Sequence, residues 1–90
     1  MDKEIVSVEA STFPDGMMLP IAVLWKDGRR FPVEKVLYYS TSPAGEYEGI
    51  RYTVLIGSAE KYIYRVKNSW YVMTHAGGGT GEDSIVTAAW

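Results

Sequence analysis

The sequence predicts an all-β fold, formed by a single small antiparallel barrel or a strongly bent meander of five to six strands. Turn signals recur at short intervals, and the runs between them are rich in Val, Ile, Tyr, Trp and Thr with an alternating period. A chain of 90 residues supports one domain with one core. Six short strands are too few for a two-sheet sandwich of about seven or more, so we expect one bent or closed sheet.

The expected strands lie between these turn signals. They span residues 5–11, 21–26, 30–39, 49–57, 61–67 and 70–75. We expect them to form one SH3-like barrel domain over residues 1–76, because consecutive strands joined by tight turns pair with one another. Residues 77–90 are expected to be a Gly-rich linker and an apolar tail, which is disordered or pairs with a sheet edge.

The first well-marked hairpin has two possible turns around Gly28. A three-residue loop with Gly28 in the left-handed conformation pairs Val23 with Phe31. It also turns Ile21 and Trp25 to the same apolar face. A two-residue type I′ turn would instead send Trp25 to the other face. We favour the three-residue loop because it buries more large apolar side chains, each worth about 1.5 to 3 kcal/mol when fully buried.

The last two hairpins are interpreted with three-residue loops at 57–59 and 67–69. In these registers Tyr52 pairs with Tyr64, and Val66 pairs with Trp70. Both registers turn the same side chains inward. The expected core of this half therefore consists of Ile50, Tyr52, Val54, Ile56, Tyr62, Tyr64, Val66, Trp70 and Val72.

The opposite face of the same strands is expected to be cationic. The predicted binding face consists of Arg51, Lys61, Arg65, Lys67 and Tyr71. Arg51 would lie directly opposite Arg65, and like charges in that position are destabilising unless something neutralises them. A bound anion or nucleic acid would do so, with Tyr71 stacking on a base. The simpler interpretation, which we favour, is a solvated face whose arginines lie over tyrosine rings and pair with nearby acids.

Composition excludes several classes of protein. The chain has no Cys, which removes disulfide frameworks, thiol nucleophiles and Cys-ligated metal sites. Nine Lys and Arg residues against eleven Asp and Glu residues give a net charge of −2, whereas nucleic-acid-binding domains are usually strongly basic. No apolar run approaches the roughly 20 residues of a membrane-spanning helix, and the chain does not begin with a secretion signal. We therefore expect a soluble cytoplasmic protein.

Catalytic and metal chemistry find little support in the sequence. Residues 77–81 resemble the glycine-rich phosphate loop of tubulin-type GTPases, but nine following residues leave no room for that α/β fold. His75 is the only histidine, which is too few for a metal site without Cys. A triad of Ser84, His75 and Asp83 would lie in or beside the glycine-rich tail, where rigid positioning is not expected. We expect no catalytic residue, no metal site, no cofactor and no enzymatic activity.

One stretch of the sequence resembles a known group of proteins. It contains Val23-x-Trp25, Gly28-Arg29, Phe31-x-Val33, Arg51-Tyr52 and the late Trp70. This arrangement is similar to that of short bacterial domains of unknown function. The resemblance covers residues 21–72 and implies a compact β fold of bacterial origin, without implying any catalytic or binding residue.

The leading functional hypothesis is a non-enzymatic β-barrel interaction module that binds an unknown protein partner or a second copy of itself. One alternative is a weak single-stranded nucleic-acid or anion binder that uses the predicted binding face. Another alternative is a homo-oligomeric structural protein, in which the apolar tail adds to the sheet of a neighbouring chain with Trp90 as its anchor.

Overall fold

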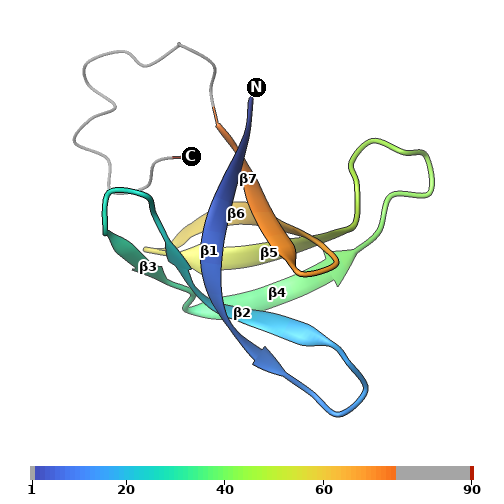
Figure 1. Ribbon diagram of the computed structural model, residues 1–90, viewed down its shortest axis with the longest axis horizontal. Coiled ribbons are helices and arrows are strands. Elements are labelled where there is room, and N and C mark those ends of the chain that lie inside the picture. The colour runs from blue at the N-terminus through green and yellow to red at the C-terminus, as the bar shows by residue number, and fades with distance from the viewer. Residues whose placement is uncertain (1, 75–89) are drawn as a thin grey trace.

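The computed structural model describes residues 2–74 and residue 90, and its strands form one antiparallel sheet (Figure 1). The seven strands are ordered β3-β2-β1-β7-β6-β5-β4 across the sheet. They are β1 (Asp2–Thr12), β2 (Met18–Leu24), β3 (Arg30–Pro32), β4 (Lys35–Ser40), β5 (Ile50–Ile56), β6 (Ala59–Val66) and β7 (Ser69–Thr74). The predicted all-β class is confirmed. The described residues contain no helix, and so none that could cross a membrane.

The sheet is curled into a half-barrel because its two outermost strands, β3 and β4, follow each other in the chain. The short connection between them contacts both ends of the curl. The Val33 N–H donates to the Ile21 carbonyl of β2 at 2.7 Å, and the Glu34 N–H donates to the Leu55 carbonyl of β5 at 2.8 Å. This change of partner divides the expected strand 30–39 into β3 and β4, so the sheet has seven strands and not five to six.

The β2–β3 hairpin has the predicted three-residue loop. The Trp25 N–H donates to the Arg29 carbonyl at 2.8 Å, and the Gly28 N–H donates to the Trp25 carbonyl at 2.9 Å. Gly28 has a φ of +94°, the left-handed conformation that glycine adopts without steric cost. Val23 pairs with Phe31 as expected, and both are buried.

One inward-facing residue of this hairpin was predicted wrongly. Ile21 is 44% exposed, although it was expected on the apolar face. The cause is a β-bulge between β1 and β2, where Glu9 pairs with Ala22 and the next residue, Ala10, pairs with Pro20. The bulge leaves Ile21 without a partner on β1 and shifts its phase relative to its neighbours.

The β5–β6 hairpin differs from the prediction by one residue. Its turn contains two residues, Gly57 and Ser58, with φ angles of 58° and 68°. Two consecutive positive φ angles define a type I′ turn, whose twist matches that of the flanking strands. Tyr52 consequently pairs with Ile63, whereas the three-residue loop would have paired it with Tyr64.

The β6–β7 hairpin shows the same difference. Val66 pairs with Ser69 across a two-residue turn in which Lys67 has a φ of 56°. Arg65 therefore pairs with Trp70, and the expected pairing of Val66 with Trp70 is wrong. Because both turns are one residue shorter than expected, β6 presents its opposite side to the core.

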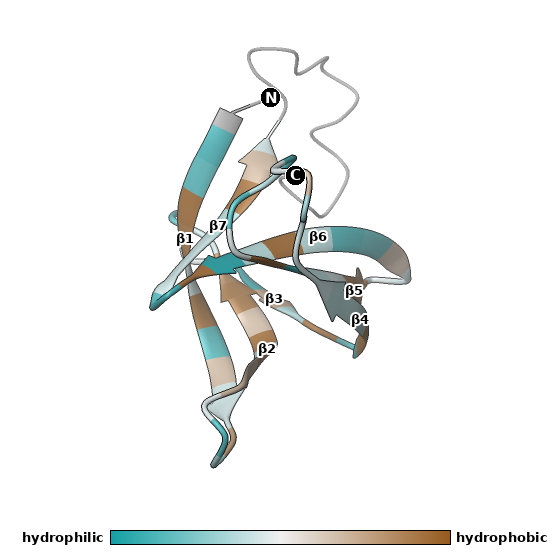
Figure 2. Ribbon diagram, turned by 90° about the vertical axis from the view of Figure 1, so that its right-hand side faces the viewer, coloured by the Kyte–Doolittle hydropathy of each residue, from teal (hydrophilic) through white to brown (hydrophobic). Residues whose placement is uncertain are grey.

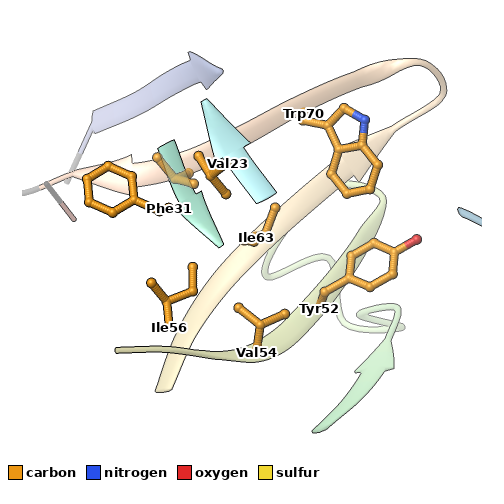
Figure 3. Close-up of a cluster of buried hydrophobic side chains, with 8 residues drawn as sticks. Val23, Phe31, Tyr52, Val54, Ile56, Ile63 and Trp70 are labelled. Carbon is orange, nitrogen blue, oxygen red and sulfur yellow. The ribbon is translucent and has the colours of Figure 1, made fainter. Parts of the chain in front are cut away.

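The core lies inside the curl of the sheet. Figure 3 shows the buried side chains pointing toward one another from several strands: Val23, Phe31, Tyr52, Val54, Ile56, Ile63, Trp70 and Val72. Five members of the expected core are confirmed, namely Tyr52, Val54, Ile56, Trp70 and Val72. The β6 members were wrong, because Ile63 occupies the place expected for the β6 tyrosines. In the second half of β1, Figure 2 shows polar and apolar residues alternating, as a sheet with one buried face requires.

Candidate interaction surface

The structure divides the five residues of the predicted binding face between the two sides of the sheet. Arg51 and Tyr71 lie on the outer, convex face, since each pairs with the same β6 residue. Lys61 and Arg65 lie on the inner face, because they alternate with that residue along β6. Lys67 is in the β6–β7 turn. The expected opposition of Arg51 and Arg65 is therefore wrong, and the five residues do not form one surface.

Arg65 is a structural residue of the inner face. Its Nε donates to the Tyr52 hydroxyl at 3.3 Å, and its Nη1 donates to the Lys67 carbonyl at 2.8 Å. Its guanidinium also lies 6.0 Å from the centre of the Trp70 ring. The Tyr52 hydroxyl in turn donates to the Met18 carbonyl of β2. These bonds connect β6, β5 and β2 and engage Nε and Nη1 of Arg65 within the fold.

The outer face carries a continuous row of side chains across five strands. The row runs through directly paired residues, in the order Ser40, Arg51, Tyr64, Tyr71 and Ile5. The rings of Tyr64 and Tyr71 are stacked, with centroids 4.7 Å apart and an interplanar angle of 6°. An outer face built from stacked aromatic rings differs from the mostly polar outer face of an ordinary antiparallel sheet.

The β4–β5 loop, residues 41–49, covers one end of this row. The Tyr47 ring meets Tyr64 edge to face at 5.5 Å, and the Tyr47 hydroxyl lies 3.0 Å from Ser40 Oγ. The Tyr71 hydroxyl donates to the Glu48 carbonyl at 3.1 Å. As a result Tyr64 and Tyr71 are buried even though they lie outside the core.

Gly49 fixes the point where this loop returns to the sheet. Its φ is +79°, and a Cβ at this position would lie 2.1 Å from the Arg65 carbonyl oxygen. Only glycine allows the backbone to approach β6 this closely in this conformation. The position of the loop over the tyrosine row therefore depends on the absence of a side chain at residue 49.

Burial of Tyr64 has an electrostatic consequence. It raises the pKa of the Tyr64 hydroxyl above its ordinary value, because the phenolate would lose hydration. The nearby Arg51 guanidinium opposes this increase by favouring the phenolate. The hydroxyl therefore stays protonated through the physiological range.

Arg51 is held between two tyrosine rings. Its guanidinium carbon lies 4.6 Å from the centre of the Tyr47 ring and 4.3 Å from the centre of the Tyr62 ring. Such contacts contribute about 0.5 to 1 kcal/mol each at exposed sites and restrict the side chain to one orientation. Its Nε is buried without a hydrogen-bond partner, and no carboxylate of the described residues forms an ion pair with it. The face thus presents an oriented cation with an unpaired charge.

Two exposed tyrosines lie beside Arg51. Tyr38 and Tyr62 are 56% and 44% exposed and flank Thr53, with which each pairs across the sheet. The two strands that carry them are separated by one strand, which places their backbones about 10 Å apart. Thr53 is fully buried, and its Oγ1 has no hydrogen-bond partner. We call Tyr38, Arg51, Thr53 and Tyr62 the outer patch.

The outer patch presents groups that make contacts. It offers two exposed aromatic surfaces and one oriented cation above the buried Thr53, with no carboxylate or imidazole among its members. No group of three or more His, Cys, Asp or Glu side chains that could hold a metal ion occurs within the described residues. Two candidates from the sequence lie outside these residues. They are the triad of Ser84, His75 and Asp83 and the glycine run 77–81.

Three members of the outer patch do not belong to the predicted binding face. The expected registers place Tyr62 in the core, and no binding role is predicted for Tyr38 or Thr53. A signal for Tyr62 was present, because Gly57-Ser58 between two alternating runs is typical of a two-residue hairpin turn. That turn would have placed Tyr62 on the face of Arg51.

Comparisons with known proteins found no relative of this chain. No protein-family model matches the chain, and neither a curated protein nor a solved structure is significantly similar to it. The resemblance to short bacterial domains stays an expectation.

Proposed function

We propose that this protein is a non-enzymatic interaction module that docks a protein partner on the outer patch. The observation that carries the proposal is the state of Arg51, a cation fixed between two tyrosine rings with no carboxylate beside it. Tyrosine and arginine are the residues most enriched where protein interfaces concentrate their binding energy. Exposed tyrosines on both sides of Thr53 extend this patch into a surface that can exclude water around the cation.

The charge of Arg51 defines the chemistry of the partner. A fork of guanidinium donors recognises a carboxylate in a bidentate manner, so the partner should present an acidic side chain beside apolar groups. Removing the cation would then leave a buried carboxylate in the complex, which costs more than losing an exposed contact.

The proposal is tested by capturing partners from the native host with a photo-crosslinking residue at position 62. We expect the wild-type chain to yield crosslinked proteins that the Arg51→Ala chain loses. A matched control places the same crosslinker at Phe13, which is 43% exposed in the β1–β2 turn and away from the outer patch. Recovery of the same proteins from the Arg51→Ala chain, or from the Phe13 control, would contradict the proposal.

The alternative function, nucleic-acid binding, would use the same surface. It is distinguished from protein binding by how its affinity depends on salt concentration. Tyr38 and Tyr62 could stack on bases, and Arg51 could contact a phosphate. That mode predicts binding to an oligonucleotide such as oligo-dT at about 50 mM salt, with affinity falling steeply as salt increases. Absence of such binding would leave the protein partner as the explanation of the patch.

Self-association is distinguished by sedimentation of the purified chain. A homo-oligomer would sediment as a dimer or larger species at micromolar concentration, and the Tyr62→Ala variant would shift toward monomer. A monomer over the full concentration range would require a partner other than a second copy.

A further inference from the structure

A second aromatic cluster lies at the inner side of the sheet, where the β2–β3 hairpin approaches β6. The Trp90 ring stacks on Trp25, with centroids 5.7 Å apart and an interplanar angle of 14°. It meets Phe31 edge to face at 5.5 Å with an angle of 89°. Lys61 Nζ donates a hydrogen bond to the main-chain oxygen of Trp90. We call Trp25, Phe31 and Lys61 the Trp90 site.

The backbone of each residue of the Trp90 site makes contacts that do not involve Trp90. Trp25 bonds through its backbone to Arg29 across the hairpin loop, and Phe31 pairs with Val23. Lys61 lies on β6, in a ladder of seven directly paired residues with β5. The sheet and its β2–β3 loop therefore position the backbone that carries all three side chains independently of Trp90.

The contacts of Trp90 are ones that an aromatic residue of another peptide could make. They consist of one stacked ring, one edge-on ring and one hydrogen bond to a main-chain oxygen. The Trp90 indole Nε1 is buried without an acceptor, so the site recognises the ring and the backbone and does not read the indole N–H. Trp90 belongs to no strand of the sheet, and residues 75–89 separate it from β7 in the sequence.

We infer that Trp25, Phe31 and Lys61 form a binding site for an aromatic residue and its main-chain oxygen, and that Trp90 is its tethered occupant. The ligand class is a short peptide with a tryptophan or similar aromatic residue. This site is on the opposite face from the outer patch and is independent of the proposed partner. Occupation by Trp90 competes with any such peptide supplied in trans.

The size of this competition can be estimated. A short tether gives an effective concentration on the order of millimolar, and one buried aromatic ring gives an affinity in the same range. The full chain should therefore bind a free peptide about 2-fold to 10-fold more weakly than a chain without the Trp90 ring, because the site is free only part of the time.

In the test, the acetylated peptide Thr-Ala-Ala-Trp, which has the sequence of residues 87–90, is titrated into the full chain. Binding is measured from the shifts of the protein's NMR resonances. The Trp90→Ala chain should bind the peptide amide with a dissociation constant on the order of millimolar, and the wild-type chain several-fold more weakly. Binding should be lost for the peptide Thr-Ala-Ala-Ala and on adding Trp25→Ala, and retained on adding Tyr62→Ala. Comparing the peptide amide with the free acid shows whether Lys61 prefers a carboxylate to a carbonyl oxygen.

Two results would overturn the inference. One is a folded Trp90→Ala chain that shows no saturable shift with up to about 10 mM peptide, well above the expected dissociation constant. The other is equal affinity of the wild-type and Trp90→Ala chains. If the Trp90→Ala chain does not fold, the same peptide is added to the wild-type chain, and the Trp90 indole N–H resonance must move to its free position. An unchanged resonance would overturn the inference as well.

Discussion

Arg51 and Arg65 lie on neighbouring strands but on opposite faces of the sheet, and their surroundings differ. Arg65 faces the core and donates to the Tyr52 hydroxyl and the Lys67 carbonyl. Arg51 faces outward, lies over two tyrosine rings and near the Tyr64 hydroxyl, and keeps a buried Nε without a partner. One arginine connects parts of the fold, and the other is oriented by the fold without being neutralised.

The two faces therefore use aromatic residues differently. On the inner face Tyr52 and Trp70 are packed with aliphatic side chains and lie in the core. On the outer face the rings of Tyr64 and Tyr71 are stacked under a loop, and Tyr62, which lies beside the row, is left exposed. The proposed docking surface is based on these exposed rings, which the fold does not need for its core.

The largest predicted effect separates the two faces at adjacent positions of β6. Ile63→Ala should lower the free energy of unfolding by about 2 to 5 kcal/mol, because Ile63 is fully buried. Tyr62→Ala should cost about 1 kcal/mol or less, since Tyr62 is largely exposed. Urea denaturation of both variants measures the difference. A larger loss for Tyr62→Ala would mean that β6 faces the other way.

The second effect concerns the loop that covers the tyrosine row. Gly49→Ala should cost about 2 to 4 kcal/mol, since a Cβ would collide with the Arg65 carbonyl and the φ is positive. Gly28→Ala is the matched control, because Gly28 also has a positive φ but open space around it, and it should cost about 1 to 2 kcal/mol. Equal losses in thermal or urea denaturation would show that the close approach is unimportant.

The third effect distinguishes the two arginines directly. Arg65→Ala should lower the free energy of unfolding by about 1 to 2 kcal/mol, because two hydrogen bonds from a charged donor are lost. Arg51→Ala should lower it by about 1 kcal/mol, since its two cation–π contacts contribute about 0.5 kcal/mol each at the low end of the range for exposed sites, while abolishing partner capture. The reverse order of stability would assign the structural role to Arg51.

These predictions rest on registers that the sequence specifies unequally. The β2–β3 loop was predicted correctly because only one phase places Val23 and Phe31 together, and the other phase offers less apolar area. Along β6 the two phases are nearly equal. One contains Tyr62, Tyr64 and Val66, and the other contains Ile63 between two long cations. Amphipathic side chains such as tyrosine and lysine suit either face, so hydrophobicity alone cannot choose between them.

The length of each turn determines which face of β6 points inward, which the strand pattern alone does not determine. A type I′ turn at Gly57-Ser58 sends Ile63 inward and lets Lys61 and Arg65 extend toward polar atoms at the ends of the strand. The error in register moved the predicted binding face, although two of its members, Arg51 and Tyr71, do lie on the outer side. Neither the β1–β2 bulge nor the loop over the tyrosine row can be predicted from alternation. The bulge is an irregularity in the pairing of two strands, and the loop is held by a side-chain bond from Tyr71 to a residue distant in the sequence.

A smaller effect is expected at alkaline pH. The folded-state pKa of Tyr64 is raised by burial, so its contribution to stability is fully present below the unfolded value of 10.0. That contribution is lost as the pH rises through the higher folded-state pKa. Tyr64→Phe should therefore flatten the fall in stability above pH 10 that thermal denaturation measures in the wild-type chain. An identical alkaline profile for Tyr64→Phe would show that the hydroxyl is not buried.

The smallest effect lies at acidic pH and outside the two faces under comparison. Arg30 donates to the Glu9 carboxylate at 2.9 Å and lowers the pKa of Glu9 below 4.5. The stabilisation is present above pH 4.5 and is lost as the pH falls through the lower folded-state value. Glu9→Gln should slightly lower thermal stability from pH 6 to 8, where the ion pair is present, and make little difference at acidic pH, where the wild-type carboxyl is protonated. A loss in the variant that is larger at acidic pH than at neutral pH would contradict this assignment.

The register of β6 is tested most directly by nuclear Overhauser contacts in the full chain. The structure predicts contacts between the Tyr64 and Tyr71 rings, whose centroids are 4.7 Å apart, and between the methyl groups of Ile63 and the core. Contacts of the Tyr64 ring with Tyr52 and Trp70, in place of those with Tyr71, would return Tyr62 to the inner face. That result would remove the outer patch on which the proposed function depends.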